Sequence, residues 1–271
     1  HQYTTYTSEP NLMEEPVFEP KHLDLMVMTE LMSKKKFSAA AKKAQELLAP
    51  HTEVIQRGYP SHDPSHLSDL RLEISECLSL LGSCYMSMDK IDLAIEALSS
   101  AVFINPTSEL FSELASQLLS AERYQEAIAA AERAIDLDPH QEVEALITKA
   151  FALWKLEQWD RDILGLCDLA LARDPYATTA LEIKAHVYTH QGNIKDALKC
   201  VDRAIAKDDS YFHLVQLKSA LLLRSNQPEI ALTAVLKFFR EDPECIEAHQ
   251  EAAKLALIVS NWKLALDHLK P

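Results

Sequence analysis

The chain contains 271 residues, of which 48% are hydrophobic and only 4 are glycine, a composition typical of a soluble helical protein. Its formal net charge of −14 at pH 7 repels phosphate backbones, so we expect no nucleic acid among its partners. No run of about 18 apolar residues occurs, and we therefore expect no membrane insertion.

Residues 1–20 predict a flexible acidic tail. Pro10, Pro16 and Pro20 stand among Thr, Ser and Glu, a composition that opposes helix formation and buries little apolar surface. The segment also contains apolar side chains that could dock on the rest of the chain, namely Tyr3, Tyr6, Leu12, Met13, Val17 and Phe18. Two interpretations therefore stay open, a linker or an intramolecular competitor for the partner site.

Residues 21–50 predict a first helical unit, and an unusual connection follows it. Residues 51–63 form a connection much longer than the few residues that normally join paired helices, and we interpret them as an insertion loop. Asp63 then supplies an N-cap and Pro64 a favourable first helical residue. The next helix is therefore predicted to run from 64 to about 88, about ten residues longer than its counterparts.

A period of about 34 residues organises the rest of the chain. Pro106, Pro139, Pro175 and Pro243 recur at intervals of 33, 36 and 68 residues, and Asp209 stands where the missing proline is expected. A fixed period of this size is typical of a stacked repeat array rather than of one globular core. Small residues, which allow two antiparallel helices to approach closely, recur with the same period at Ala94, Ala127, Ala197, Ala231 and Ala265.

The pattern is most complete in residues 75–107. Large and small residues occur there at fixed offsets, at Leu78, Leu81, Gly82, Tyr85, Ala94, Leu98, Ala101 and Pro106. This pattern resembles the tetratricopeptide repeat. The resemblance implies an all-α, right-handed superhelical solenoid of antiparallel helix pairs over residues 21–271, with about seven units of which the last is incomplete. Since a repeat array needs a polar capping helix at each end, we expect the chain to be the front part of a longer solenoid or to dock onto another molecule.

One unit, residues 143–177, departs from the pattern. Asp162 occupies the small-residue position, and eight residues rather than seven separate it from Ala170. We expect a π-bulge to absorb the extra residue, with Gly165 easing the strain. Drift in a tolerant repeat and a kink that a partner requires are both consistent with this irregularity.

Motifs for catalysis and metal binding are missing. Glycine occurs only at positions 58, 82, 165 and 192, which excludes a phosphate-binding glycine loop, and neither H-E-x-x-H nor G-x-S-x-G occurs. Pro64 stands between His62 and His66, so we interpret these histidines as loop residues rather than metal ligands. Five cysteines, an odd number, favour reduced thiols and a cytoplasmic or nuclear compartment. We therefore expect no enzyme activity, no catalytic residue, no cofactor and no metal.

Partner-binding positions follow from the resemblance. In this family the first helices of successive units line a concave groove. The matching positions here are Ser112, Ser116, Leu119, Glu144, Ile147, Phe151, Trp154, Glu182, His186 and Gln216, preceded by Glu76, Ser79 and Glu109. Because one edge of this groove is acidic, we expect the partner segment to be basic or apolar.

The centre of the groove is apolar. Ile147, Phe151 and Trp154 follow one another at spacings of four and three residues, which places them on one helical face. We expect them to form an exposed anchor pocket for a partner side chain. The competing interpretation assigns Phe151 and Trp154 to the core between helices.

The sequence thus predicts a non-enzymatic scaffold for protein–protein interaction, an adaptor that binds an extended or helical segment of a partner protein in its groove. We expect the chain to be a component of a larger complex. Two alternatives remain open. One is an architectural subunit packed permanently in a multiprotein complex, and the other is a regulatory repeat region of a larger enzyme.

Overall fold

The computed structural model describes residues 25–57, 67–139, 143–159, 161–207, 212–239 and 242–269. These residues form α-helices and one 3-10 helix, and no strand occurs among them, so the all-α prediction is confirmed. The helices are α1 (Met26–Ser33), α2 (Phe37–Leu48), η1 (Ala49–His51), α3 (Thr52–Arg57), α4 (Leu67–Ser87), α5 (Ile91–Ile104), α6 (Ser108–Ser120), α7 (Tyr124–Leu137), α8 (Val143–Lys155), α9 (Ile163–Arg173), α10 (Thr178–His190), α11 (Ile194–Lys207), α12 (Phe212–Arg224), α13 (Pro228–Phe238), α14 (Ile246–Ile258) and α15 (Trp262–Leu269).

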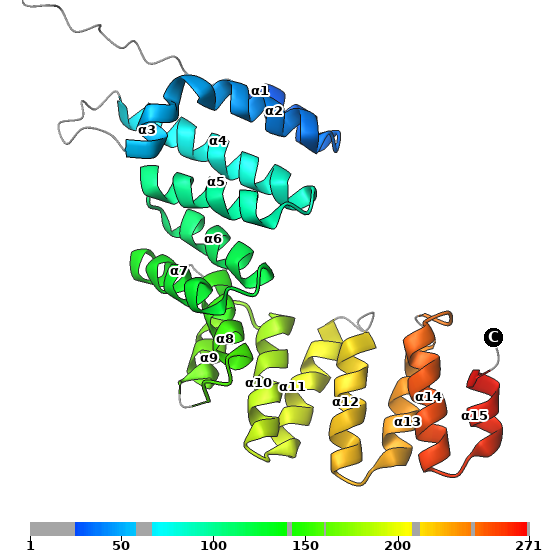
Figure 1. Cartoon of the computed structure of the whole chain (residues 1–271). Helices are drawn as coiled ribbons and strands as arrows, with labels where there is room; N and C mark the ends of the chain where they lie inside the picture. The colour runs from blue at the N-terminus through cyan, green and yellow to red at the C-terminus, as the bar shows by residue number, and fades with distance from the viewer. Residues whose placement is uncertain are drawn as a thin grey trace, which may run out of the picture.

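The helices are arranged in antiparallel pairs that stack into a curved array (Figure 1). The pairs are α1 with α2, α4 with α5, α6 with α7, α8 with α9, α10 with α11, α12 with α13, and α14 with α15. Each pair also packs on the next through the second helix of one unit and the first helix of the following unit. The described chain therefore contains the seven units that the period predicts.

Short turns with left-handed backbone reverse the chain inside each unit. Most of these turns have three residues between the helices, and one of the three has a positive φ. The non-glycine residues with positive φ, between 54° and 60°, are Lys35, Asp89, Glu122, Glu157, Asn226 and Ser260, and Gly192 has a φ of 76°. A left-handed residue at this place ends the first helix and lets the second helix fold back along it.

Small side chains hold the paired helices close together. Ala94, Ala127, Ala197 and Ala231 are fully buried, so the alanine period marks the places where helices cross. At Gly82 the fit is tighter still, because a Cβ atom there would lie 3.1 Å from Leu98 Cγ. These positions have no room for a larger residue, which is why the pattern of small residues is so regular.

The region between the first two units differs from the predicted insertion loop. Residues 49–57 form η1 and α3 instead of a loop, and α3 packs on α5. A proline near the start of η1 favours that helix. Helix α3 is favoured by the 2.9 Å ion pair between Arg57 Nη1 and Glu53 Oε1. The rest of the predicted loop, with His62 and His66, lies outside the described residues, as does the predicted tail. Helix α4 has 21 residues where α6 has 13, in agreement with the predicted long helix.

The irregular fourth unit, formed by α8 and α9, does not contain the predicted π-bulge. Asp162 is the N-cap of α9, where its Oδ1 accepts a hydrogen bond from the Gly165 backbone N–H at 2.8 Å. The connection from α8 covers residues 156–162, and α9 is a regular α-helix of 11 residues. A carboxylate cannot replace alanine at a buried helix crossing, so the first turn of α9 is absent and Asp162 is exposed. The π-bulge prediction was wrong for this reason.

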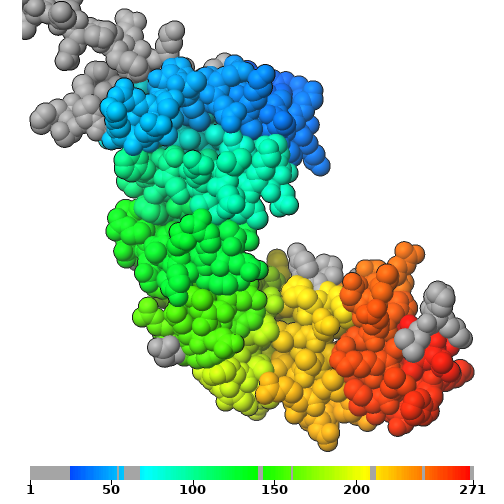
Figure 2. Space-filling view, in the orientation of Figure 1, coloured from blue at the N-terminus to red at the C-terminus, as the bar shows by residue number. Residues whose placement is uncertain are grey.

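The first helices lie on the inner side of the curve. Helix α6 contacts α8, α8 contacts α10, and α12 contacts α14, whereas no comparable contact joins successive second helices among the described residues. Elements on the inside of a curved stack are closer together than those on the outside. Figure 2 shows the hollow that the array encloses, with the middle of the chain at its bend.

Ion pairs link the central units. Lys149 Nζ lies 2.9 Å from Glu132 Oε1 at the α7–α8 junction, and Lys218 Nζ lies 2.7 Å from Asp202 Oδ1 at the α11–α12 junction. Between them, Lys184 pairs with Asp168 at the α9–α10 junction. The three pairs occupy the same register in successive units. We call them the lysine rungs.

Candidate functional site

The predicted groove residues lie on the first helices α6, α8, α10 and α12, most of them at the surface. Glu144 and Gln216 are exposed. The half-buried members are Ser116, Leu119, Ile147, Phe151, Trp154, Glu182 and His186. Ser112 differs, because it is only 6% exposed and offers little surface to a partner.

An aromatic patch occupies the junction of α8 and α10. We define it as Phe151, Trp154, Lys155 and His186. The Trp154 ring makes a T-shaped contact with Phe151, with 5.1 Å between centroids, and stacks on the His186 ring at 4.3 Å. Lys155 Nζ lies 4.4 Å from the centroid of the Trp154 ring, within the range of a cation–π interaction. Trp154 therefore contacts the neighbouring helix and also leaves part of its ring at the surface. Neither the exposed anchor pocket nor the core between helices, the two interpretations from sequence, describes it alone.

Glu182 connects α10 to α12. Its Oε1 lies 3.8 Å from His186 Nε2 and its Oε2 lies 3.4 Å from His213 Nε2. The nearby imidazole of His186, followed by that of His213, lowers the pKa of the Glu182 carboxyl against the opposing effect of burial. Glu182 thus contacts one histidine of its own helix and one of the next unit, and it offers less to a partner than its sequence position indicates.

Hydroxyl groups donate to carboxylates across other first-helix junctions. Ser79 Oγ donates to Glu113 Oε2 at 2.8 Å, and Ser116 Oγ donates to Glu144 Oε1 at 2.9 Å. Near the far end, Ser219 Oγ donates to Glu251 Oε1 at 2.8 Å. Sequence reasoning did not assign these roles to Glu113, Ser219 and Glu251, although each hydroxyl and its acceptor are separated by roughly one repeat.

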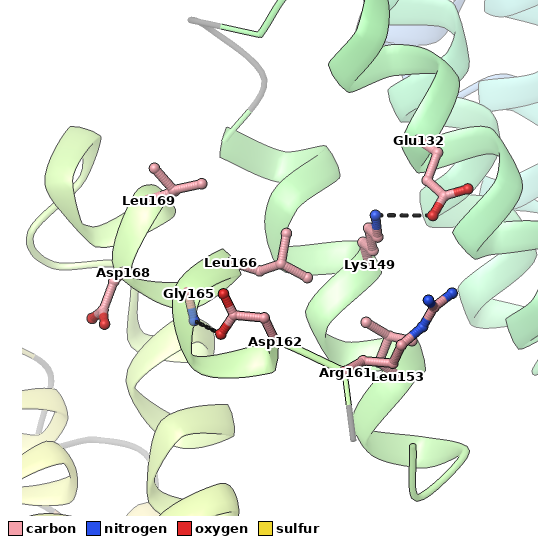
Figure 3. A pocket seen from close by; sticks show the side chains of 9 residues that line it. All are labelled: Glu132, Lys149, Leu153, Arg161, Asp162, Gly165, Leu166, Asp168 and Leu169. Carbon is pink, nitrogen blue, oxygen red and sulfur yellow. Dashed lines mark hydrogen bonds and ion pairs between the residues drawn. The ribbon is translucent and has the colours of Figure 1, made fainter. Parts of the chain in front are cut away.

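A second hollow lies on the other side of the array, between α7, α8 and α9. Figure 3 shows this pocket of about 560 Å³, with Leu166 in its middle and the ion pair between Lys149 and Glu132 at one edge. A similar hollow of about 460 Å³ includes Lys218, at the position of Lys149, and residues of α13. In both hollows a lysine of the first helix lies beside residues of the second helix of the same unit.

The remaining reactive groups offer little chemistry. Within the described ranges, no three His, Cys, Asp or Glu side chains form a group that could hold a metal ion. Cys77 and Cys167 are fully buried, and burial raises the pKa of each thiol to about 12, which keeps both protonated and unreactive at neutral pH. Of the helices that the structure describes, none has the length and apolar character that a bilayer crossing requires.

Comparison with known proteins identifies the repeat. Family models described as tetratricopeptide repeat match residues 75–108 and 112–178. Among solved structures, a tetratricopeptide repeat protein from Parabacteroides merdae is similar with a TM-score of 0.67 and 14% identity, over 90% of this chain and 88% of that one. PilW, a type IV pilus biogenesis factor, has a TM-score of 0.65 and 16% identity, over 84% of this chain and 94% of its own. YrrB, described as having an unusual peptide-binding site, has a TM-score of 0.54 and 18% identity, over 70% of this chain and 88% of its own.

Proposed function

Because this chain belongs to the tetratricopeptide repeat family, we propose that it is a non-enzymatic protein-interaction scaffold that binds a segment of a partner protein along its first helices. The fold supports this proposal, since α6 contacts α8, α8 contacts α10 and α12 contacts α14, and Glu182 links α10 to α12. YrrB, which has a similar fold, is known as a protein with a peptide-binding site and offers a parallel for this proposal.

The aromatic patch is the single observation that carries the proposal. At the positions of Phe151 and Trp154, the preceding unit has Ser116 and Leu119, and the unit before it has Ser83 and Met86. Only the fourth unit places two aromatic rings there, and both remain half-buried on the inner side of the curve. Aromatic side chains of this kind are the residues that most often anchor a partner.

The partner segment that fits this surface is apolar or basic. Its apolar side chain would pack beside Trp154 and Ile147. Glu109 and Glu144 are exposed on the same series of helices and would attract a positive charge. The net charge of −14 would add a long-range attraction that weakens as salt rises.

Replacement of one tryptophan tests the role of the patch. The chain offers a matched control, because Trp159 also stacks on a histidine of α10, His190, at 4.1 Å between ring centroids, but is not a predicted groove residue. In affinity purification followed by titration of the captured partner, we expect Trp154→Ala to weaken binding at least tenfold and Trp159→Ala to leave it within about twofold. Circular dichroism checks that both variants remain helical. Equal losses in the two variants would remove the patch from the binding site.

A further inference from the structure

A pocket of about 530 Å³ lies near the amino-terminal end of the array, between α1, α4 and α6. We call it the amino-terminal pocket. Its walls come from the start of α1, from residues 72–80 of α4, and from the start of α6 with the residues before it. The pocket is far along the array from the aromatic patch on α8 and α10 (Figure 1).

Leucine side chains give the pocket its apolar surface. Leu25, Leu72, Leu80 and Leu110 all line it. Leu72, in the second turn of α4, is 48% exposed. An exposed leucine inside a concave surface is a place where a second apolar side chain would be buried.

The polar groups of the pocket fall into two classes. The first class is already satisfied within the chain, since Ser79 donates to Glu113, Asn105 donates to Ser75 at 3.3 Å, and Thr107 caps α6. These groups hold the walls in place and are not available to a ligand.

The second class consists of two carboxylates, those of Glu76 and Glu109. Both residues are exposed, and neither takes part in an ion pair or a side-chain hydrogen bond within the described residues. The lining of the pocket contains no lysine, arginine or histidine. The pocket thus combines an apolar floor with two uncompensated negative charges.

We propose that the amino-terminal pocket binds a segment of a partner protein in which an apolar side chain lies next to a lysine or arginine. The apolar side chain packs on Leu72, and the cation lies between Glu76 and Glu109. The proposal rests on the scaffold function above and specifies what the amino-terminal end of the same first-helix groove binds, away from the aromatic patch.

Charge also favours this occupant over two others, the protein's own residues 1–24 and a second copy of the chain. Residues 1–24 contain Glu9, Glu14, Glu15, Glu19 and Asp24 but only one lysine, Lys21, so their own charge opposes binding beside Glu76. A second copy of the chain is disfavoured for the same reason, given its net charge of −14. A cationic segment of a different protein satisfies the charges that the pocket leaves open.

Synthetic peptides test the proposal directly. The probe is a fluorescein-labelled, alanine-rich 15-residue helix with two leucines four residues apart and a lysine beside each. Two matched peptides carry glutamate in place of lysine, or alanine in place of leucine. In fluorescence anisotropy with the full chain at low salt, we expect saturable binding of the first peptide and at least fivefold weaker binding of the other two.

Variants of the protein locate the site. Glu76→Gln with Glu109→Gln should weaken binding of the lysine–leucine peptide at least fivefold and reduce its salt dependence, and Leu72→Ser should also weaken it. Glu229→Gln with Glu244→Gln makes the same change of charge at exposed positions of α13 and the loop after it, and should leave binding unchanged. Thermal unfolding establishes that each variant is folded.

The remaining outcomes overturn the proposal. It fails if the full chain does not bind the peptide, or if the control pair weakens binding as much as the pocket pair. A loss with Trp154→Ala but not with the pocket pair would place the peptide on the aromatic patch, which supports the scaffold function while removing this pocket. A rise in affinity after removal of residues 1–20 would identify the protein's own tail as the occupant.

Discussion

The central and terminal junctions of this array have the same backbone arrangement but different chemistry. At α7–α8, α9–α10 and α11–α12, a lysine of the first helix pairs with an acid of the preceding second helix. At α5–α6 and α13–α14 the lysine position holds Leu114 and Ala252, which are 8% and 0% exposed. The acid position holds Leu236 at α13–α14 but the exposed Ser99 at α5–α6. The comparison shows that this repeat interface accepts either a charge pair or a buried apolar residue in place of the lysine.

A lysine placed at an apolar junction should have the largest effect on the free energy of unfolding. Ala252→Lys would place a lysine at a buried terminal position, where Leu236 stands in the register of the acid. We expect a loss of about 3 kcal/mol or more in the free energy of unfolding, because the charge has no partner. Urea denaturation monitored by circular dichroism measures it. The second substitution Leu236→Asp should restore part of the loss, and a double variant no more stable than Ala252→Lys alone would contradict the comparison.

Removal of one lysine rung should have a smaller effect. Lys184 is 12% exposed and its partner Asp168 is 62% exposed, so solvent screens the pair. We expect Lys184→Met to lower the free energy of unfolding by about 1 kcal/mol, with Leu114→Met at a terminal junction as the apolar control.

The pH dependence of this rung has a defined sign. Burial alone would lower the pKa of Lys184, but the hydrogen bond with Asp168 and its charge outweigh burial and raise the pKa above 10.5. The contribution of the rung is therefore complete below pH 10.5 and is lost as pH rises through the raised pKa. The stability difference between the native chain and Lys184→Met should shrink in that alkaline range. A difference that stays constant there would show that packing, not charge, is responsible.

The smallest effect on the free energy of unfolding is expected at Glu182, which links the first helices α10 and α12. The pKa of Glu182 is lowered below 4.5, so its contribution is present above pH 4.5 and is lost as pH falls through the lowered pKa. We expect Glu182→Gln to cost about 0.5 to 1 kcal/mol near neutral pH and almost nothing at pH 3. Amide hydrogen exchange in α10 and α12, compared with α4 and α5 as an internal control, measures the effect locally. Equal changes in both regions would argue against a local role.

The fold could be predicted from sequence because its determinants are periodic. The proline and alanine positions repeat with the unit, and burial of Ala94, Ala127 and Ala197 follows from helix crossing alone. The arrangement of the fourth unit could not be predicted in the same way. Counting residues identifies the extra one, but whether the helix bulges or starts late depends on the cost of burying Asp162 against the gain from capping α9.

The candidate site was only partly predictable. The helical face of Phe151 and Trp154 follows from spacing, but the stacking of Trp154 on His186 depends on how two units are set against each other. The amino-terminal pocket depends on how the starts of α1 and α6 are set against α4, and the sequence leaves the start of each helix uncertain by several residues. Helix α3 was missed because residues 51–63 were interpreted as one insertion loop from the length of the connection.

The lysine rungs have a consequence for how such a chain can change its length. If the segment from α8 to α9 were deleted, Glu132 of α7 would meet Lys184 of α10, and the junction would again contain one acid and one lysine. Deletion of α10 and α11 would bring Asp168 of α9 to Lys218 of α12 with the same result. The central units are thus interchangeable at their borders, so a gene duplication or loss there preserves matched charges, while the units at the two ends cannot be exchanged with them.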